Sequence, residues 1–141
     1  MTPAEVILLV GSPGSGKSWV SSQLKDKFLV LEHDDFHQKE HYIAALASAA
    51  RQAKRKILGN TPFGLTDLTQ GLAGIGVKVI PVFIVEPDIV LSARYMQREK
   101  KSIPKGHITR QETYRSRAKE LGSFIGTSAE VLKHLKGMVS H

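Results

Sequence analysis

The sequence predicts an α/β fold, in which a mainly parallel β-sheet is flanked by helices. Apolar, strand-like runs alternate along the chain with segments of helical periodicity, and this alternation is typical of a parallel sheet. The first apolar run, residues 6–10, leads directly into a glycine-rich turn. The residues of this turn are Gly11, Ser12, Pro13, Gly14, Ser15, Gly16, Lys17 and Ser18. With 141 residues, of which 41% are hydrophobic, residues 1–141 are expected to form one domain with a sizeable core.

In the first half of the chain, apolar runs at 6–10 and 28–32 predict strands, and the segment 17–26 between them predicts a helix. A long helix is expected at 38–57, because its apolar residues recur at helical spacing. Glycine, asparagine and proline gather at 59–64, and this composition predicts a break.

In the second half, a short helix at 65–73 is expected before a buried strand at 77–85, which is apolar on both faces. Pro81 within this strand predicts a bulge or an early edge, because proline has no N–H to donate to a sheet. Asp88 is expected to cap a helix at 89–100.

Two capping-box patterns predict the last helices. Thr109 with Glu112 is expected to open a helix that ends at about Leu121, and Thr127 with Glu130 is expected to open the terminal helix.

The glycine-rich turn matches the pattern G-x-x-x-x-G-K-[ST] at every fixed position, which predicts a P-loop NTPase fold. Its glycines let backbone N–H groups point into one concavity, which binds phosphate together with the helix N-terminus. Lys17 is expected to reach the β- and γ-phosphates of ATP, and the Ser18 hydroxyl is expected to ligate Mg²⁺. Trp19, the next residue, is expected to pack inward. The alternative is a glycine turn that happens to hold a lysine.

Two acidic residues follow the second strand. Ligands of a parallel sheet bind beyond the carboxyl ends of its strands, so Asp34 and Asp35 are expected at the mouth of the P-loop. One of the two carboxylates is expected to accept the proton of an attacking hydroxyl. The other is expected to hold Mg²⁺ through water or to fix the first. The alternative is an acidic loop that caps the following helix.

A basic segment predicts a short lid. Arg94 and Arg98 are four residues apart and share a helix face, where two guanidinium groups suit the charge on a transferring phosphoryl group. Lys101 and Lys105, in the basic loop 100–107, are expected to bind substrate. The alternative is a solvated basic helix face. Four further residues are either lid groups or surface charges: His107, Arg110, Arg115 and Arg117.

The formal net charge of +7 favours a polyanionic partner, so nucleic acid is expected, with DNA as the first candidate. A solvated basic surface, or charge that serves ATP alone, is the alternative. There are no cysteines, and His33, His37 and His41 span a loop-to-helix junction, so no metal cluster is expected. No apolar run approaches the roughly 20 residues that span a membrane, and we expect a cytoplasmic protein without a membrane partner.

At these residues the chain resembles the kinase domain of phage-type polynucleotide kinases, within the wider group of small nucleoside and nucleotide kinases. The likeness covers about residues 5–105. It rests on the P-loop, on Asp34-Asp35-Phe36, and on the lid arginines followed by Lys101 and Ile103-Pro104. The resemblance implies ATP and Mg²⁺ as cofactors and Asp34 as the base for a 5′-hydroxyl.

The chain departs from this family in two places. His37 stands where the family has a basic residue that contacts substrate phosphate, and Asn60-Thr61-Pro62 stands where many members have Asp-Thr-Asn. Handling of the substrate can therefore differ from 5′-end phosphorylation. Some phages phosphorylate hydroxymethylated pyrimidines within DNA with kinases of this general kind, and that acceptor suits the basic charge equally well.

The sequence therefore predicts an ATP-dependent kinase that transfers the γ-phosphate to a hydroxyl on nucleic acid, at a 5′ end or on a hydroxymethylated base. A kinase of free nucleosides or nucleotides is the enzymatic alternative, and it predicts a small closed pocket with weak salt dependence. A non-catalytic nucleotide switch or ATPase is a second alternative, and it predicts hydrolysis of ATP without a phosphorylated acceptor.

Overall fold

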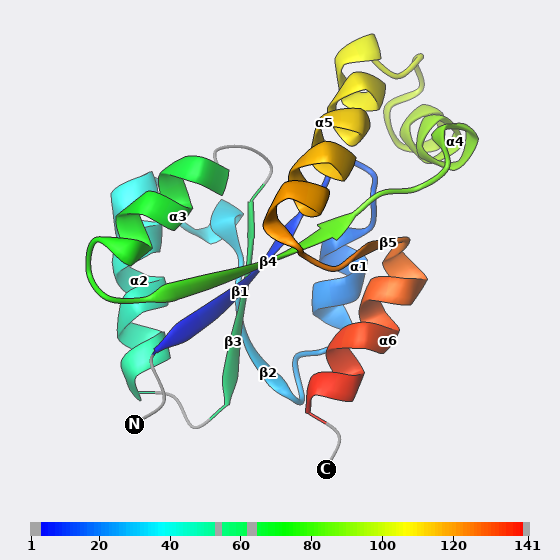
Figure 1. The fold of residues 1–141 in the computed structure, drawn as a ribbon. Coiled ribbons are helices and arrows are strands. Elements are labelled where there is room, and N and C mark those ends of the chain that lie inside the picture. The colour runs from blue at the N-terminus through cyan, green and yellow to red at the C-terminus, as the bar shows by residue number, and fades with distance from the viewer. Residues whose placement is uncertain (1–3, 53–54, 62–64, 140–141) are drawn as a thin grey trace.

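A computed structural model describes residues 4–52, 55–61 and 65–139, in which strands and helices alternate (Figure 1). The strands are β1 (Glu5–Val10), β2 (Phe28–Leu31), β3 (Lys56–Thr61), β4 (Lys78–Ile84) and β5 (Ile125–Gly126). The α-helices are α1 (Lys17–Ser22), α2 (Lys39–Gln52), α3 (Leu65–Ala73), α4 (Asp88–Glu99), α5 (Lys105–Leu121) and α6 (Ser128–Met138). A 3₁₀ turn, η1 (His33–Asp35), follows β2.

The sheet has the strand order β2-β3-β1-β4-β5, and every pair of neighbours is parallel. In the centre, Val6 of β1 lies opposite Ile57 of β3 on one side and Val79 of β4 on the other. Because all strands run the same way, their carboxyl ends meet at one edge, where the P-loop follows β1 and η1 follows β2 (Figure 1). The predicted α/β fold with a parallel sheet is confirmed.

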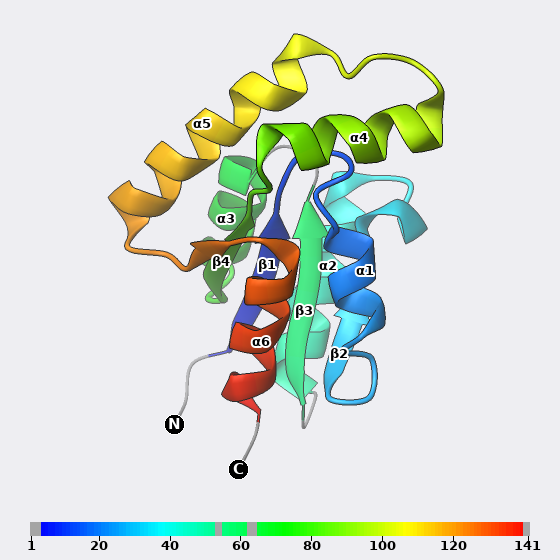
Figure 2. The same cartoon turned by 90° about the vertical axis from the view of Figure 1, so that its right-hand side faces the viewer.

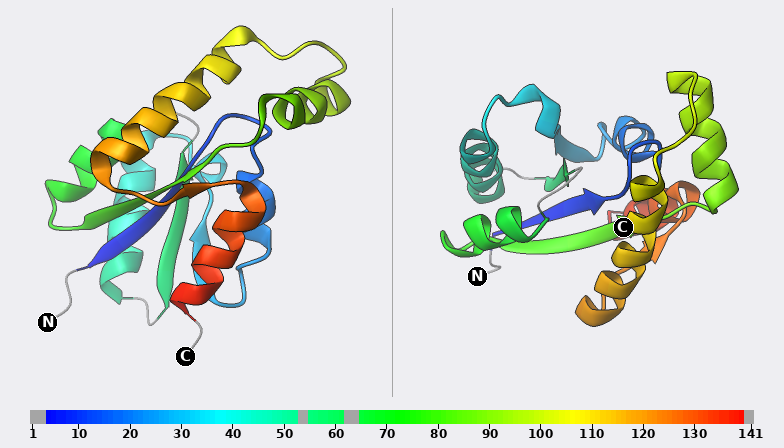
Figure 3. Two further views of the ribbon diagram at one scale, coloured as in Figure 1. Left: turned by 45° about the vertical axis from the view of Figure 1, so that its right-hand side comes forward. Right: turned by 90° about the horizontal axis from the view of Figure 1, so that it is seen from above.

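The central strand β1 is buried on both faces. Val6 and Leu8 pack against α2 and α3, whereas Ile7 and Leu9 pack against α1 and α6. Figure 3 shows the sheet between these two helical layers. Strands of this kind are apolar at successive positions, which is why β1 is a continuous apolar run in the sequence. Figure 2 shows α4 and α5 crossing above the carboxyl edge of the sheet.

The expected helix at 38–57 is confirmed over residues 39–52 as α2, but its end is wrong, because Lys56 and Ile57 already belong to β3 beside β1. Glycine at position 59 does not make a turn. A Cβ on Gly59 would lie 2.6 Å from the Tyr42 hydroxyl and 2.9 Å from Leu8 Cδ2, so glycine lets α2 pack closely on the sheet. The remainder of the expected break, residues 62–64, lies outside the described residues.

Three expected helix starts or ends are also wrong. Helix α1 ends at Ser22, because the carbonyl of Leu24 accepts from the N–H groups of Lys27 and Phe28 in a turn that leads straight into β2. Asp88 lies inside the first turn of α4, whose N-cap is Pro87.

Helix α5 begins at Lys105 with Pro104 as its N-cap, so Thr109 and Glu112 lie within it and do not open it. The other capping box is confirmed. The N–H of Glu130 donates to Thr127 Oγ1 at 3.3 Å, and the N–H of Thr127 donates to Glu130 Oε1 at 2.9 Å.

The edge expected at Pro81 is confirmed. Pro81 lies opposite Leu8 of β1, but on its other side β5 pairs only with Phe83 and Ile84. The N–H of Phe83 donates to the carbonyl of Phe124 at 3.0 Å. Alternate residues of a strand direct their N–H groups to the same side, so the nitrogen of Pro81 faces the part of the edge that β5 does not reach.

Within the described ranges, no helix combines the length and the apolar character that crossing a membrane requires.

Candidate nucleotide-binding site

A cavity of about 680 Å³ lies at the carboxyl edge of the sheet, and its size is typical of small-molecule pockets. Its walls are formed by residues of the P-loop, η1, the end of β3, one face of α4 and the start of α6. The lining residues are Ser12, Pro13, Gly14, Gly16, Lys17, Ser18, Trp19, Asp34, Asn60, Arg94, Arg98, Ser128 and Ala129.

Glycine is required in the P-loop at two positions for different reasons. Gly16 has a φ of +105°, and a Cβ there would also lie 2.8 Å from Ser128 Cβ. At Gly11 a Cβ would lie 2.5 Å from Ser15 Oγ. The loop is therefore packed closely on itself and on α6, so its backbone N–H groups are held in place before a ligand binds.

The Lys17 side chain bends back over the loop, where its ammonium donates to the carbonyls of Gly11 and of Ser12, the latter at 3.4 Å. The pKa of Lys17 is lowered to about 8, mainly by burial. The charges of Arg110 and Arg98 contribute to this lowering, whereas Asp34 opposes it. Positive charges thus converge on Lys17, and a bound phosphate would relieve their repulsion.

We expect the affinity for MgATP to fall as the pH rises above about 8, by at most about tenfold per pH unit. Phosphate favours the charged form of Lys17, so binding raises the pKa of Lys17 and takes up a proton above the pKa of the free protein. Trp19 is the only tryptophan and lines the cavity, so its fluorescence can follow the titration. The matched variant is Lys17→Arg, whose charge persists at these pH values, and it should bind with a flat pH profile. An identical decline in that variant would assign the titration to another group.

Asp34 faces the cavity from η1, and its side chain is 99% exposed. The turn that carries Asp34 is held in place by hydrogen bonds to a residue of β3. The N–H of His33 donates to Asn60 Oδ1 at 3.0 Å, and the side-chain amide of Asn60 donates to Glu32. Asn60 is thus a positioning residue that sequence reasoning missed, because the strand that carries it was not predicted.

Tyr42 of α2 links the carboxyl ends of strands β2 and β3. Its buried hydroxyl donates to the carbonyl of Leu31 at 2.6 Å and accepts from the N–H of Asn60 at 2.9 Å. Burial raises the pKa of Tyr42, so the hydroxyl keeps its proton for this hydrogen bond.

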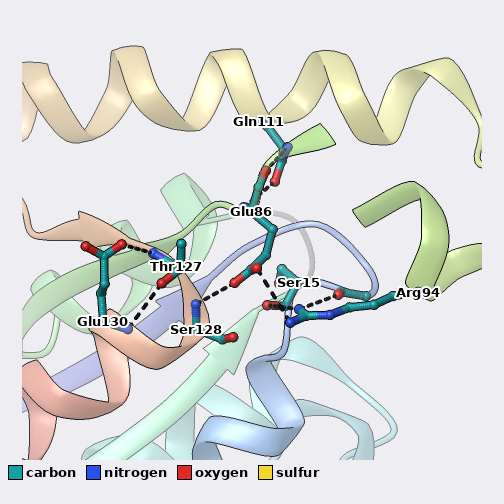
Figure 4. A network of polar contacts seen from close by, with 8 residues as sticks. Ser15, Glu86, Arg94, Gln111, Thr127, Ser128 and Glu130 are labelled. Atoms are coloured by element: carbon teal, nitrogen blue, oxygen red, sulfur yellow. Dashed lines mark hydrogen bonds and ion pairs between the residues drawn. The ribbon is translucent and has the colours of Figure 1, made fainter. Parts of the chain in front are cut away.

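The two lid arginines line the cavity from one face of α4. Arg94 Nη1 donates to the carbonyls of Gly14 and Ser15, at 3.3 and 3.2 Å (Figure 4). Arg98 lies over the ring of Tyr95, 5.8 Å from its centroid, and its Nε donates to Glu99 at 3.0 Å. The structure therefore brings the P-loop, Asp34 and both arginines into one cavity.

Helix α5 contacts the site at its beginning. Ser12 Oγ donates to the carbonyl of His107 at 2.9 Å, and Arg110 acts on the charge of Lys17. Further along, Arg115 and Arg117 form ion pairs on α5 itself, with Glu112 and Glu120. His107 and Arg110 therefore lie where groups of a lid were expected, whereas Arg115 and Arg117 are surface charges.

Four predicted site residues are exposed and do not line the cavity: Asp35, His37, Lys101 and Lys105. Their substrate contacts stay predictions. The expected inward packing of Trp19 is wrong, because this side chain is 47% exposed and forms part of the cavity wall.

The oxygen groups of the cavity suit Mg²⁺ bound to a nucleotide. This ion prefers oxygen ligands and commonly takes only one or two from protein, with phosphate and water completing its shell. Ser18 and Asp34 present such oxygens to the cavity. In the part of the chain that the structure covers, no group of three or more His, Asp or Glu side chains could hold a metal ion by itself.

Comparison with known proteins places this cavity in a known architecture. No protein-family model matches the chain, and no curated protein matches it in sequence. A de novo designed P-loop fold protein superposes with a TM-score of 0.51 at 16% identity, over 98% of this chain and 94% of its own. The chain has the P-loop NTPase fold. The predicted fold class is confirmed.

Two natural proteins share this fold. A gluconokinase from Sinorhizobium meliloti 1021 superposes with a TM-score of 0.61 at 18% identity, over 94% of this chain and 90% of that protein. The tunicamycin resistance protein of Deinococcus radiodurans superposes with a TM-score of 0.72 at 17% identity, over 96% of each chain. These likenesses concern the fold, and the closer resemblance to polynucleotide kinases stays a prediction.

Proposed function

We propose that the protein is an ATP-dependent phosphotransferase that transfers the γ-phosphoryl group to a hydroxyl of a small molecule. The observation that carries this proposal is the cavity itself. It places a complete P-loop, a carboxylate on η1 and two arginines on α4 around a space of about 680 Å³. Phosphoryl transfer depends almost entirely on such positioning and charge.

In the proposed reaction, the P-loop N–H groups and Lys17 bind the β- and γ-phosphates, and Ser18 with an acidic residue would hold Mg²⁺. Bound there, Mg²⁺ would neutralise charge on the phosphate oxygens. Asp34 accepts the proton of the acceptor hydroxyl as its oxygen bonds to the γ-phosphorus, and the bond from that phosphorus to the bridging oxygen of ADP breaks. Arg98 stabilises the charge on the transferring group.

Two observations support a small acceptor. The cavity is lined on one side by Arg94 and Arg98 of α4, and its volume is that of a small-molecule pocket. The structural relative from Sinorhizobium meliloti is named for a small-molecule kinase activity. A sugar-like compound, a nucleoside or a nucleotide would each present a hydroxyl of suitable size.

Nucleic acid remains the second candidate acceptor, and the charge distribution favours it. The net charge is +7, and Lys101 and Lys105, just before and at the start of α5, are exposed and do not line the cavity. These lysines could contact a phosphate backbone whose 5′-hydroxyl, or whose hydroxymethylated base, enters the cavity.

We expect label from γ-labelled ATP to enter sugar acids, nucleosides or nucleotides in preference to a 5′-hydroxyl oligonucleotide, with a weak dependence of the rate on salt. A nucleic-acid acceptor held by three or four phosphates would instead give a log–log salt slope of about −2 to −4. In that case Lys101→Ala with Lys105→Ala would make the slope shallower. Lys25→Ala with Lys27→Ala, which removes equal charge from exposed sites outside the cavity, would not. Label found only in inorganic phosphate, with every acceptor, would indicate an ATPase or switch.

A further inference from the structure

A buried carboxylate behind the P-loop has no part in the proposed reaction. Glu86 follows β4 and is only 5% exposed. Its Oε1 accepts from the N–H of Ser128 at 2.6 Å, and its Oε2 lies 3.5 Å from Arg94 Nη2 (Figure 4). A buried carboxylate is costly unless charged or polar groups compensate it, so this arrangement indicates a specific role.

The backbone of Glu86 is fixed as firmly as its side chain. The N–H of Glu86 donates to Gln111 Oε1 at 3.0 Å, and its carbonyl accepts from Gln111 Nε2 at 2.9 Å. Gln111 lies on α5, is itself buried, and also donates to Asp88 at 3.1 Å. Glu86 therefore joins helix α5, the start of α6 and, through Arg94, helix α4.

Arg94 extends this network to the phosphate-binding loop. Its Nη1 holds the carbonyls of Gly14 and Ser15, at 3.3 and 3.2 Å. A peptide unit is planar and trans, so its N–H points opposite to its carbonyl. By holding these two carbonyls, Arg94 fixes the directions of the N–H groups of Ser15 and Gly16. The N–H of Ser15 donates to the carbonyl of Ser12 at 3.0 Å, so through Ser15 Arg94 supports the loop's own turn, and through Gly16 it orients an N–H toward phosphate. The positive charge on the carbonyl side also polarises both peptide units and strengthens their N–H groups as donors.

We propose that Glu86 is a positioning residue, which acts through Arg94 to hold the P-loop backbone in its phosphate-binding form. The proposal rests on the proposed function in one respect, that phosphate is the ligand of this loop. It assigns Arg94 a role in ground-state binding of phosphate, besides the role in stabilising the transferring group that was expected from its position on α4.

The test is the affinity for inorganic tripolyphosphate, which carries no nucleoside, measured by Trp19 fluorescence. Glu86→Gln keeps an oxygen for the N–H of Ser128 but removes the charge that holds Arg94. Arg94→Ala removes the guanidinium from an exposed part of α4. We expect each change to weaken binding by about five- to tenfold, the usual effect of losing a charge-assisted contact. The double variant should bind no more weakly than Arg94→Ala alone, because Glu86 acts through Arg94.

The matched control is Glu130→Gln, which removes a carboxylate from the capping box at the same end of α6 without contacting Arg94 (Figure 4). It should bind tripolyphosphate like the wild type, which excludes loosening of α6 as the cause. Wild-type affinity in Glu86→Gln, or losses that multiply in the double variant, would overturn the proposal. If Glu86→Gln fails to fold, unchanged affinity in Arg94→Ala would overturn it instead. A wild-type protein that binds no MgATP would overturn the proposed function itself.

Discussion

Replacing Lys17 with alanine is expected to abolish phosphoryl transfer while the fold remains intact. The ammonium of Lys17 lies within the loop that we propose receives the phosphates, and it donates to the carbonyls of Gly11 and Ser12. Preorganised charges of this kind act in a partly water-excluded site, and loss of one costs about 10²–10³-fold or more in turnover.

The same substitution should leave the stability of the nucleotide-free protein unchanged or higher. Burial lowers the pKa of Lys17 to about 8, so the folded state holds this proton less tightly than the unfolded state does. The charged lysine therefore opposes folding below about pH 8, and the protein gains stability as the pH rises from about 8 toward the ordinary lysine pKa. The positive charge is also unfavourable at the N-terminus of α1.

Turnover and thermal unfolding with and without MgATP would check both expectations for Lys17→Ala. The wild type should gain stability on adding nucleotide, and the variant should gain much less. A large loss of stability in the absence of nucleotide would mean that Lys17 is structural.

Replacing Asp34 with asparagine is expected to lower turnover by about 10²–10⁴-fold, the usual cost of removing a general base, with much less effect on ATP affinity. The carboxylate is exposed to the cavity and is carried by a turn that Asn60 fixes independently, so asparagine fits without strain. Asp34 also raises the pKa of Lys17, so the pH above which binding weakens should move to a lower value in Asp34→Asn.

The neighbouring residue is the matched control for this change. Asp35 lies on the same turn but does not line the cavity, so Asp35→Asn should lower turnover much less than Asp34→Asn does. A large loss in Asp35→Asn, with Asp34→Asn nearly silent, would exchange the two roles.

The parts of the fold that follow from local sequence could be predicted. The run 6–10, the P-loop and the capping box at Thr127 each carry their own signal, and each forms as expected. Strand β3 has no such signal, because its apolar core is only Ile57 and Leu58 and its glycine suggests a turn. Its structure depends on pairing with β1 and β2 and on packing against Tyr42, which are contacts between segments far apart in the chain.

The site divides in the same way. Lys17, Asp34, Arg94 and Arg98 belong to short motifs, and the structure brings all four to one cavity. Glu86 acts through partners many residues away, so nothing in its local sequence marks it. Asn60 stands out in the sequence only as a departure from the family that the chain resembles, and its contacts with His33 and Glu32 depend on a strand that was not predicted. For Arg94, sequence spacing indicated the face on which it lies, but only the structure shows its hydrogen bonds to the P-loop carbonyls. The sequence could not show that Lys101 and Lys105 lie outside the cavity, because their positions depend on where α5 begins.

The central claim is that one cavity holds the phosphates of ATP against the P-loop and presents the γ-phosphate to Asp34. A crystal structure of the complex with Mg²⁺ and a non-hydrolysable ATP analogue tests it most directly. We expect the β- and γ-phosphates on the N–H groups of residues 14–18, with Lys17 turned from the loop carbonyls to the phosphates. The Asp34 carboxylate should face the γ-phosphate across a space that an acceptor hydroxyl can enter. An analogue bound elsewhere, or a γ-phosphate directed away from Asp34, would contradict the account.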